Sequence, residues 1–271
     1  MVRLGLSTSS LHPLPIAEAF RLGALAGFDG VEVMVTGDPR TRDATGIRAL
    51  SREHGLPVLS VHAPVLAGSQ TTWGLSPAGK LERAALLALE LGAATVVAHP
   101  PYRWQRRWSR AFEPEVARIA SRHGVQIAVE NMFALRLAGR RVEAHRAVDP
   151  TALDCAAYTL DVSHAAADGR DALELALAMG ERLRHLHLCD GGGRPGRDAH
   201  LVPGRGTQPV AALLRMLAER DWGGVLVAEV ATRHAADGAE RLALLGETVR
   251  FTRAALASGR RRDATQGTPA R

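Results

Sequence analysis

The run VQIAVE at residues 125–130, a strand-length apolar segment that ends in a glutamate, decides the fold because its pattern recurs along the chain. The same pattern is found in LPVLSVH (56–62), ATVVAH (94–99), YTLD (158–161), LRHLHL (183–188) and GVLVAE (224–229). Each run ends at, or is soon followed by, a histidine, aspartate or glutamate. In a parallel barrel the C-terminal ends of the strands converge on one mouth, where such enzymes keep their catalytic residues. The pattern therefore predicts a polar cluster at the mouth of a barrel.

Strand and helix patterns alternate from one end of the chain to the other, as they do in parallel βαβ units. The expected strands are 3–7, 29–35, 57–62, 94–99, 125–130, 157–161, 183–188 and 224–229. Between them lie amphipathic helices such as PIAEAFRLGALAG (15–27), PAGKLERAALLALELG (77–92) and PVAALLRMLAERD (209–221). No glycine-rich phosphate loop of the Rossmann or Walker type is present. The pattern therefore favours an α/β fold, a single (β/α)8 TIM barrel, over an open doubly wound sheet.

Length and composition agree with one barrel. We expect it to occupy residues 1–257, with a last helix near 238–257, and we expect 258–271 (SGRRRDATQGTPAR) to be a disordered basic tail. Cys155 and Cys189 have no paired spacing, which argues against a disulfide framework and for a reducing compartment. Met1 leads directly into an apolar strand, and no apolar run is long enough to cross a bilayer. We therefore expect a cytoplasmic protein without a membrane partner.

The charge balance raises the question of nucleic-acid binding, because the net charge is +6 and the pI is about 10.4. The tail accounts for +3 of this charge, since its four arginines stand against Asp263 alone. Lys80 is the only lysine, so a general preference for arginine contributes to the balance. The charge therefore does not identify a partner, and a nucleic-acid partner is not expected. The oligomeric state is not predicted by the sequence.

Four residues end consecutive expected strands and can reach one ion together: Glu130, Asp161, His187 and Glu229. Buried carboxylates without a counter-charge are costly, so their convergence predicts a cation at the mouth. Imidazole and carboxylate ligands suit zinc or manganese better than calcium. For any one acid, the alternative is that it caps the following helix. That alternative accounts less well for four residues in series.

Five further residues are candidate metal ligands: His62, His99, His164, Asp198 and His200. His164 follows Asp161 by three residues, and Asp198 precedes His200 by two, so each pair can chelate an ion locally. A lone histidine at a strand end, such as His62, is more often a hydrogen-bonded structural residue. The full set would accommodate one to three ions.

Other polar residues receive different interpretations. His185 points the same way as His187 but one layer deeper, which predicts a core residue. Asp190 is interpreted as a helix or turn cap. No role is predicted for the histidines at positions 12, 54, 123, 145 and 234.

Long loops follow several expected strands. One contains Trp73, and two others read PPYRWQRRWSR (100–110) and NMFALRLAGRRVEAHRAVDP (131–150). Long loops in compact domains are typically lids or binding loops, or else disordered. The aromatics either close over a substrate or only seal the barrel mouth. In the glycine-rich loop after 183–188, Arg194, Arg197 and Arg205 could grip a phosphate, or this could be an ordinary surface loop.

The motifs SVHAP, VVAHP, AVEN, LDVSH, HLHLCD, DAHLVPGRG and VAEV resemble those of the xylose-isomerase-like TIM barrels, also called the AP endonuclease 2 family. The resemblance covers about residues 1–257. It implies two candidate activities. One is that of the sugar phosphate isomerases and epimerases, and the other is that of endonuclease IV, a trinuclear zinc enzyme that cuts DNA at abasic sites.

The endonuclease IV ligand set maps onto this chain in full. By this resemblance, His62 and His99 hold one zinc, and Glu130 bridges it to a second. Asp161, His187 and Glu229 complete the second site, and His164, Asp198 and His200 form the third. The loops that place DNA in that nuclease are not matched, because APVLAGS, PPYRW and ENMFALR stand in their positions. The segment HLHLCDGGGRPGRDAHLVPGRG looks closer to the sugar phosphate isomerase/epimerase group.

Two mechanisms follow from these residues. As an isomerase or epimerase of a sugar or sugar phosphate, the protein uses Glu130 and Glu229 to move a proton through an enediolate, with His164 and Arg197 orienting substrate oxygens and Arg205 contacting phosphate. As a multinuclear phosphoesterase, it uses the same cluster for in-line attack of water on phosphorus. The ligand set favours the second mechanism and the loops favour the first, which we place ahead. A non-catalytic metal-binding barrel accounts least well for the full ligand set.

Overall fold

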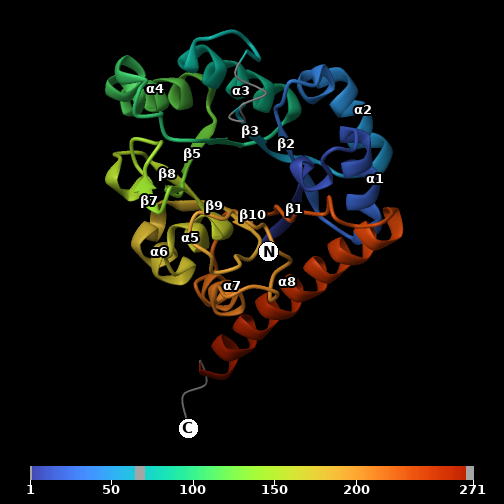
Figure 1. Ribbon diagram of the computed structural model, residues 1–271. Helices are drawn as coiled ribbons and strands as arrows, with labels where there is room; N and C mark the ends of the chain where they lie inside the picture. Colours follow the sequence, from blue (N-terminus) through green and yellow to red (C-terminus); the bar gives the residue numbers. More distant parts are fainter. Residues whose placement is uncertain (1, 65–70, 267–271) are drawn as a thin grey trace.

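Residues 2–64 and 71–266, which the computed structural model describes, form a closed barrel of parallel strands surrounded by helices (Figure 1). The strands follow the order β1-β10-β9-β8-β5-β4-β3-β2 around the barrel. Their bounds are β1 (Arg3–Ser7), β2 (Gly30–Met34), β3 (Val58–His62), β4 (Thr95–Ala98), β5 (Gln126–Glu130), β8 (Ala157–Asp161), β9 (Leu183–Leu188) and β10 (Val225–Ala228). The expected (β/α)8 barrel is confirmed, and each strand lies within one residue of its expected bounds.

The register of the strands brings the candidate ligands to one level. Asp161 of β8 is paired with His187 of β9, and His187 is paired with Val227 of β10, two residues before Glu229. Glu130 of β5 is paired with Thr159, which points to the same face of β8 as Asp161. Because parallel strands are held by backbone hydrogen bonds on both sides, these positions are fixed by the sheet.

Helices cover the outside of the barrel. They are α1 (Ile16–Ala26), α2 (Ala44–His54), α3 (Pro77–Leu91), α4 (Arg106–His123), α5 (Val162–Asp168), α6 (Ala172–Met179), α7 (Val210–Glu219) and α8 (Gly238–Gln266). Short 3₁₀ helices are η1 (Thr8–Leu11), η2 (Pro39–Arg42), η4 (Pro150–Ala152) and η5 (Gly180–Arg182). Gly169 ends α5 with φ of +79°, a conformation that glycine adopts without strain, and this turn allows α6 to follow at once. Two helices therefore lie between β8 and β9.

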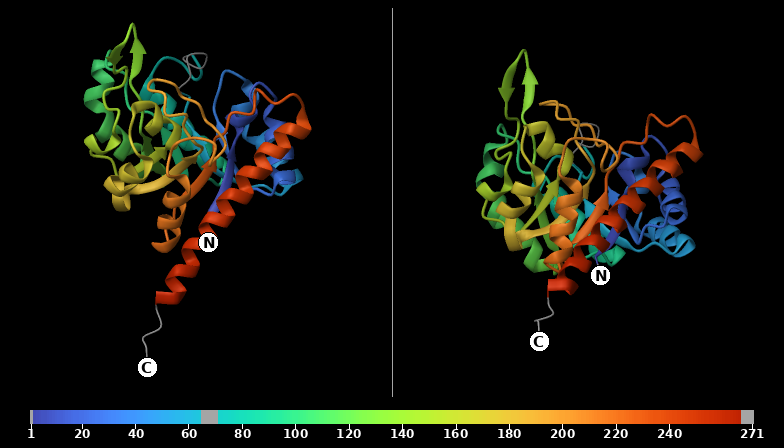
Figure 2. Two further views of the ribbon diagram at one scale, coloured as in Figure 1. Left: turned by 60° about the horizontal axis from the view of Figure 1, so that its bottom comes forward. Right: turned by 90° about the horizontal axis from the view of Figure 1, so that it is seen from below.

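The segment between β5 and β8 departs from the regular alternation, because the structure gives it no α-helix. It forms a hairpin of β6 (Leu135–Leu137) and β7 (Arg140–Val142), followed by η4. All six strand residues of the hairpin are exposed, and it projects from the barrel (Figure 2). The long loop expected after residue 130 is thus partly a β-ribbon. Residues 65–70, in the loop that also contains Trp73, lie outside the described residues.

Helix α8 is longer than expected. It packs against α7 and α1 and continues past residue 257, so helical structure reaches into the segment predicted as a disordered tail (Figure 2). Residues 267–271 of that segment lie outside the described residues. Cys155 and Cys189 are both free and buried. Across the described ranges, each helix is too short or too polar to traverse a lipid bilayer.

Candidate metal centre

Glu130 lies at the middle of the polar cluster and is contacted by four imidazoles. Its Oε2 atom lies 3.2 Å from His62 Nε2 and 3.0 Å from His99 Nε2. Its Oε1 atom lies 3.0 Å from His187 Nδ1 and 3.3 Å from His164 Nδ1. Burial alone would raise the pKa of Glu130, but the facing imidazoles of His187 and His99 hold it well below the ordinary value. Glu130 is therefore an ionised carboxylate that can share its two oxygens between neighbouring ions.

His187 Nδ1 faces three carboxylates at once. The distances from this nitrogen are 3.0 Å to Glu130 Oε1, 3.2 Å to Glu229 Oε2 and 3.5 Å to Asp161 Oδ2. Ligand atoms held about 2.0–2.2 Å from a tetrahedral zinc lie roughly 3.3 Å from one another, so this spacing fits one divalent ion. Burial lowers the pKa of His187, but the carboxylates, Glu229 first among them, raise it well above its ordinary value. The four strand-end residues predicted to converge are brought together.

Asp161 both caps a helix and faces the cluster. Its Oδ1 atom accepts a hydrogen bond of 2.7 Å from the backbone N–H of His164, at the first turn of α5. Asn131 joins the ends of β5 and β8, because its side-chain oxygen accepts from Asp161 N and its amide donates to Asp161 O. Asp161 Oδ2 is buried and has no hydrogen-bond partner among the described residues. A buried carboxylate oxygen without a hydrogen-bond partner is suited to binding a cation.

A second group of ligands lies on the loop after β9. Asp198 Oδ2 lies 2.9 Å from His200 Nε2 and 3.5 Å from His164 Nε2. Ser163 Oγ donates to Asp198 Oδ1 at 2.6 Å and accepts the backbone N–H groups of Ala199 and His200. His200 has φ of +43°, which costs a non-glycine residue about 1–3 kcal/mol and is typical of functional sites. The loop therefore contains a strained residue, His200, whose Nδ1 lies 2.8 Å from the backbone oxygen of Glu229, while Asp198 faces His164.

The histidines of the cluster differ in protonation. Burial lowers the pKa of His99 to about 4 against the attraction of Glu130, so its imidazole is neutral at neutral pH. Burial also opposes protonation of His164, but Asp161 and Asp198 raise its pKa to about 10. Since a ligating imidazole must be unprotonated, an ion at His164 would displace a proton, whereas His99 has none to lose.

Two cavities border the cluster. One, of about 150 Å³, is lined by Glu229 and His200 together with residues of η1 and of the loop after β10, including Ser9, Thr232 and Arg233. The other, of about 100 Å³, adjoins His99 and is lined by residues that include Lys80, Tyr102, Gln105 and Trp108. Ser9 Oγ donates to Glu229 Oε1 at 2.7 Å, which leaves Glu229 Oε2 facing His187. A small molecule in the first cavity therefore reaches Glu229 directly.

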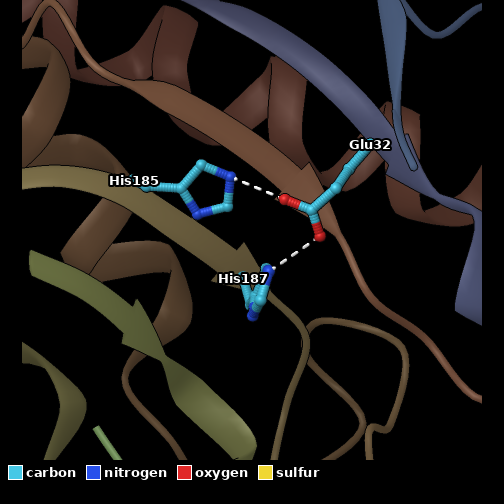
Figure 3. Close-up of side chains that lie close together, drawn as sticks. All are labelled: Glu32, His185 and His187. Atoms are coloured by element: carbon cyan, nitrogen blue, oxygen red, sulfur yellow. Dashed lines mark hydrogen bonds and ion pairs between the residues drawn. The ribbon is translucent and has the colours of Figure 1, made fainter. Parts of the chain in front are cut away.

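Glu32 is a member of this network that the sequence analysis did not identify. It lies in the middle of β2, is fully buried, and directs one oxygen to each of His185 and His187 (Figure 3). The search for ligands considered strand ends, and Glu32 lies inside an apolar run. An acid flanked by valines in VEVMV (31–35) is the signal that could have indicated it. His185 is buried as expected, although its contacts are polar.

The loop arginines are placed differently from the ligands. Arg205 forms a two-contact ion pair with Glu247 of α8, with Nε 2.8 Å from Oε1. Arg194 and Arg197 are exposed, and Arg197 is next to Asp198 in the chain. Asp190 accepts the backbone N–H groups of Gly191, Gly204 and Gln208, so its interpretation as a loop cap is confirmed.

Comparison with protein families gives one match that covers most of the chain. The model of the family described as xylose isomerase-like TIM barrel matches residues 20–255. An uncharacterised protein of Mycobacterium leprae is 45% identical over 273 residues, which cover 93% of this chain and 97% of that protein.

Proteins with known activities are more distant. A fructoselysine 3-epimerase of Escherichia coli O157:H7 is 22% identical over 255 residues, covering 86% of this chain and 92% of that enzyme. The crystal structure of a D-tagatose 3-epimerase-like protein superposes with a TM-score of 0.70 at 20% identity. That superposition covers 98% of this chain and 100% of the other. At this identity the structural match shows a shared fold.

Proposed function

The chain belongs to the xylose isomerase-like TIM barrel family, and we propose that it is a divalent-metal-dependent isomerase or epimerase of a sugar or sugar phosphate. The observation that carries this proposal is the convergence of Glu130, Asp161 and Glu229 on His187 Nδ1. One nitrogen and three carboxylate oxygens form a ligand set for zinc or manganese. Two of the carboxylates are glutamates, which can also move protons.

Such an ion would polarise the carbonyl oxygen and the neighbouring hydroxyl oxygen of a sugar. This would acidify the C–H bond of the hydroxyl-bearing carbon next to the carbonyl group. Glu229 is the better placed of the two proton carriers, because it borders a cavity and Ser9 fixes its orientation. We assign to Glu229 the removal of the proton, which it later releases to water. Glu130, which is ionised at rest, would first take up a proton, for example from the His164 imidazolium 3.3 Å away, and then return it to the other face of an enediolate. Each step moves one proton, and the substrate is rearranged without gaining or losing atoms.

Other residues would bind and orient the substrate. His164 and Arg197 are assigned to substrate oxygens. Arg205 could contact a phosphate group only by exchanging its ion pair with Glu247 for that group. The relatives named as fructoselysine 3-epimerase and D-tagatose 3-epimerase-like support a small sugar-like substrate.

The test is hydrogen exchange at carbon. Incubation with ketoses and ketose phosphates in heavy water should incorporate deuterium next to the carbonyl group of a substrate, and only in the presence of metal. The exchange should vanish in Glu130→Gln and in Glu229→Gln, because loss of either proton carrier stops the cycle. A panel of sugars without exchange would count against an isomerase or epimerase.

A multinuclear phosphoesterase is the second candidate, and a specific observation favours it. The cluster offers more ligands than one ion needs, because His62 and His99 face Glu130 Oε2 while His164 and His200 face Asp198. Several ions can stabilise the attacking and leaving oxygens of a phosphodiester. Metal-dependent hydrolysis of a generic phosphodiester, together with no exchange at carbon, would favour this candidate.

A further inference from the structure

Glu32, His185 and His187 form a buried polar group beneath the metal centre (Figure 3). All three side chains have 0% exposure. Glu32 Oε1 lies 3.0 Å from His187 Nε2, and Glu32 Oε2 lies 3.0 Å from His185 Nε2. Glu32 therefore contacts the ring nitrogen of His187 that points away from the other carboxylates.

Both ring nitrogens of His187 face carboxylates: Nε2 faces Glu32, and Nδ1 faces the three candidate ligands Glu130, Asp161 and Glu229. A neutral imidazole has one N–H donor and one nitrogen with a free lone pair, and its partners decide which is which. An ion among those three carboxylates would take the lone pair of Nδ1, which leaves the ring proton on Nε2, where Glu32 accepts it.

Glu32 is itself held in place. Its Oε2 atom accepts a hydrogen bond of 2.7 Å from Ser60 Oγ and lies 3.0 Å from His185 Nε2, which also lies 3.2 Å from Ser60 Oγ. His185 Nδ1 is buried and has no hydrogen-bond partner among the described residues. That state suits a neutral imidazole whose proton is on Nε2, because only a lone pair is then left unmatched. Both histidines therefore direct an N–H group at Glu32.

The ligand atoms of these three side chains lie within 4.8 Å of one another, close enough for an ion of their own. Such an ion would have to displace both the Ser60 hydrogen bond to Glu32 and the protons on the two Nε2 atoms. A carboxylate that accepts the outer N–H of a ligating histidine is a recurring arrangement around protein-bound metals.

We infer that Glu32 is a positioning residue that fixes His187 with Nδ1 directed at the metal. The inference rests on the metal centre proposed above. It assigns to Glu32 an effect on metal affinity through His187, without contact with metal or substrate.

The first test is Zn²⁺ affinity, measured by competition with a chromophoric chelator. Glu32→Gln keeps the size of the side chain, but an amide is a weaker acceptor and its NH₂ group favours the opposite tautomer of His187. We expect the Kd for Zn²⁺ to rise by about 10–100-fold, the usual effect of losing such a partner. Glu247→Gln, which removes a surface carboxylate, is the matched control and should leave this Kd unchanged. A folded Glu32→Gln variant with the wild-type Kd would overturn the inference.

Loss of folding is covered by two further measurements. If Glu32→Gln fails to fold, Glu32→Asp takes its place, because it keeps the charge but shortens the side chain that reaches His187. The Kd for Zn²⁺ is then judged by the same expected rise. In wild-type protein loaded with ¹¹³Cd²⁺ and labelled with ¹⁵N-histidine, His187 should show cadmium coupling at Nδ1 and a proton at Nε2. Coupling at Nε2 would overturn the inference even if every variant unfolds. Wild-type protein that binds neither ion would instead overturn the metal centre, and the inference with it.

Discussion

The strand ends of the barrel and the loop after β9 (residues 189–206) contribute two differently built parts of the candidate site. At the strand ends, Glu130, Asp161 and His187 are buried, and the sheet register fixes their spacing. In the loop, Asp198 and His200 are partly exposed; Ser163 Oγ donates to Asp198 Oδ1 and accepts the backbone N–H of His200. The strand ends are therefore fixed by the sheet, whereas the loop ligands are held by fewer contacts, some of which run through the single side chain of Ser163.

The arginines of this region show a third situation. Arg205 is exposed and paired with Glu247 on α8, and Arg197 is exposed beside Asp198. An exposed ion pair contributes little to stability and can be exchanged for another anion. The contacts of the strand ends are thus the most fixed, those of the loop ligands are intermediate, and those of the arginines are the most exchangeable. We therefore expect substitutions to affect metal binding or catalysis most at the strand ends, less at the loop ligands and least at the arginines.

The largest effect is expected at the strand ends. Glu229→Gln removes a charged ligand, and we expect the Kd for Zn²⁺ to rise by more than about 100-fold, beyond the effect of an outer-shell partner. Ser9→Ala removes only the hydrogen bond to Glu229 Oε1, so it should raise the Kd for Zn²⁺ by about tenfold or less. Metal content after dialysis and circular dichroism would measure binding and folding separately. Full metal occupancy in a folded Glu130→Gln, Glu229→Gln double variant would rule out this centre.

A smaller effect is expected at the loop ligands. If His62, His99, Asp198 and His200 are ligands, metal-saturated protein should hold about two or three ions, because each needs roughly four ligands and Glu130 can be shared. Asp198→Asn should lower the count by one ion and leave the strand-end ion in place. Elemental analysis per chain gives the number.

Ser163→Ala is a graded companion to that variant, since it removes only the donor to Asp198 Oδ1. It should weaken the binding of the loop ion without abolishing it.

A single ion in metal-saturated wild-type protein would confine the chemistry to the strand ends. It would also favour the isomerase or epimerase over the phosphoesterase.

The same series explains how much could be predicted from the sequence. Strand-length apolar runs, six of which end in or near His, Asp or Glu, were sufficient to place all eight strands and to predict that the nine candidate ligands meet. The apolar runs are easy to recognise there, because strands buried on both faces are almost continuously hydrophobic. Their roles in binding and catalysis stay predictions.

Features that depend on tertiary contacts were not predictable in this way. The carboxylate of Glu32 is stable inside the barrel only because His185, His187 and Ser60 face it from other strands. The β6–β7 hairpin and the two helices after β8 follow from turns rather than from periodicity. Likewise, Ser163 shows its role only once α5 and the loop after β9 are placed side by side.

The smallest effect is expected at the arginines. If Arg197 contacts a phosphate, Arg197→Ala should raise the KM for a phosphorylated sugar by about tenfold or more, the usual worth of a hydrogen bond to a charged group. The KM for the unphosphorylated sugar should not change. Arg205→Ala should alter the KM less, because Arg205 gives up Glu247 for every contact it gains. Steady-state kinetics with matched sugar and sugar-phosphate pairs, with metal content verified for each variant, would measure this difference. Equal changes for both sugars would assign the arginines to the loop conformation instead of phosphate recognition, and a larger effect of Arg205→Ala would reverse the order of the two.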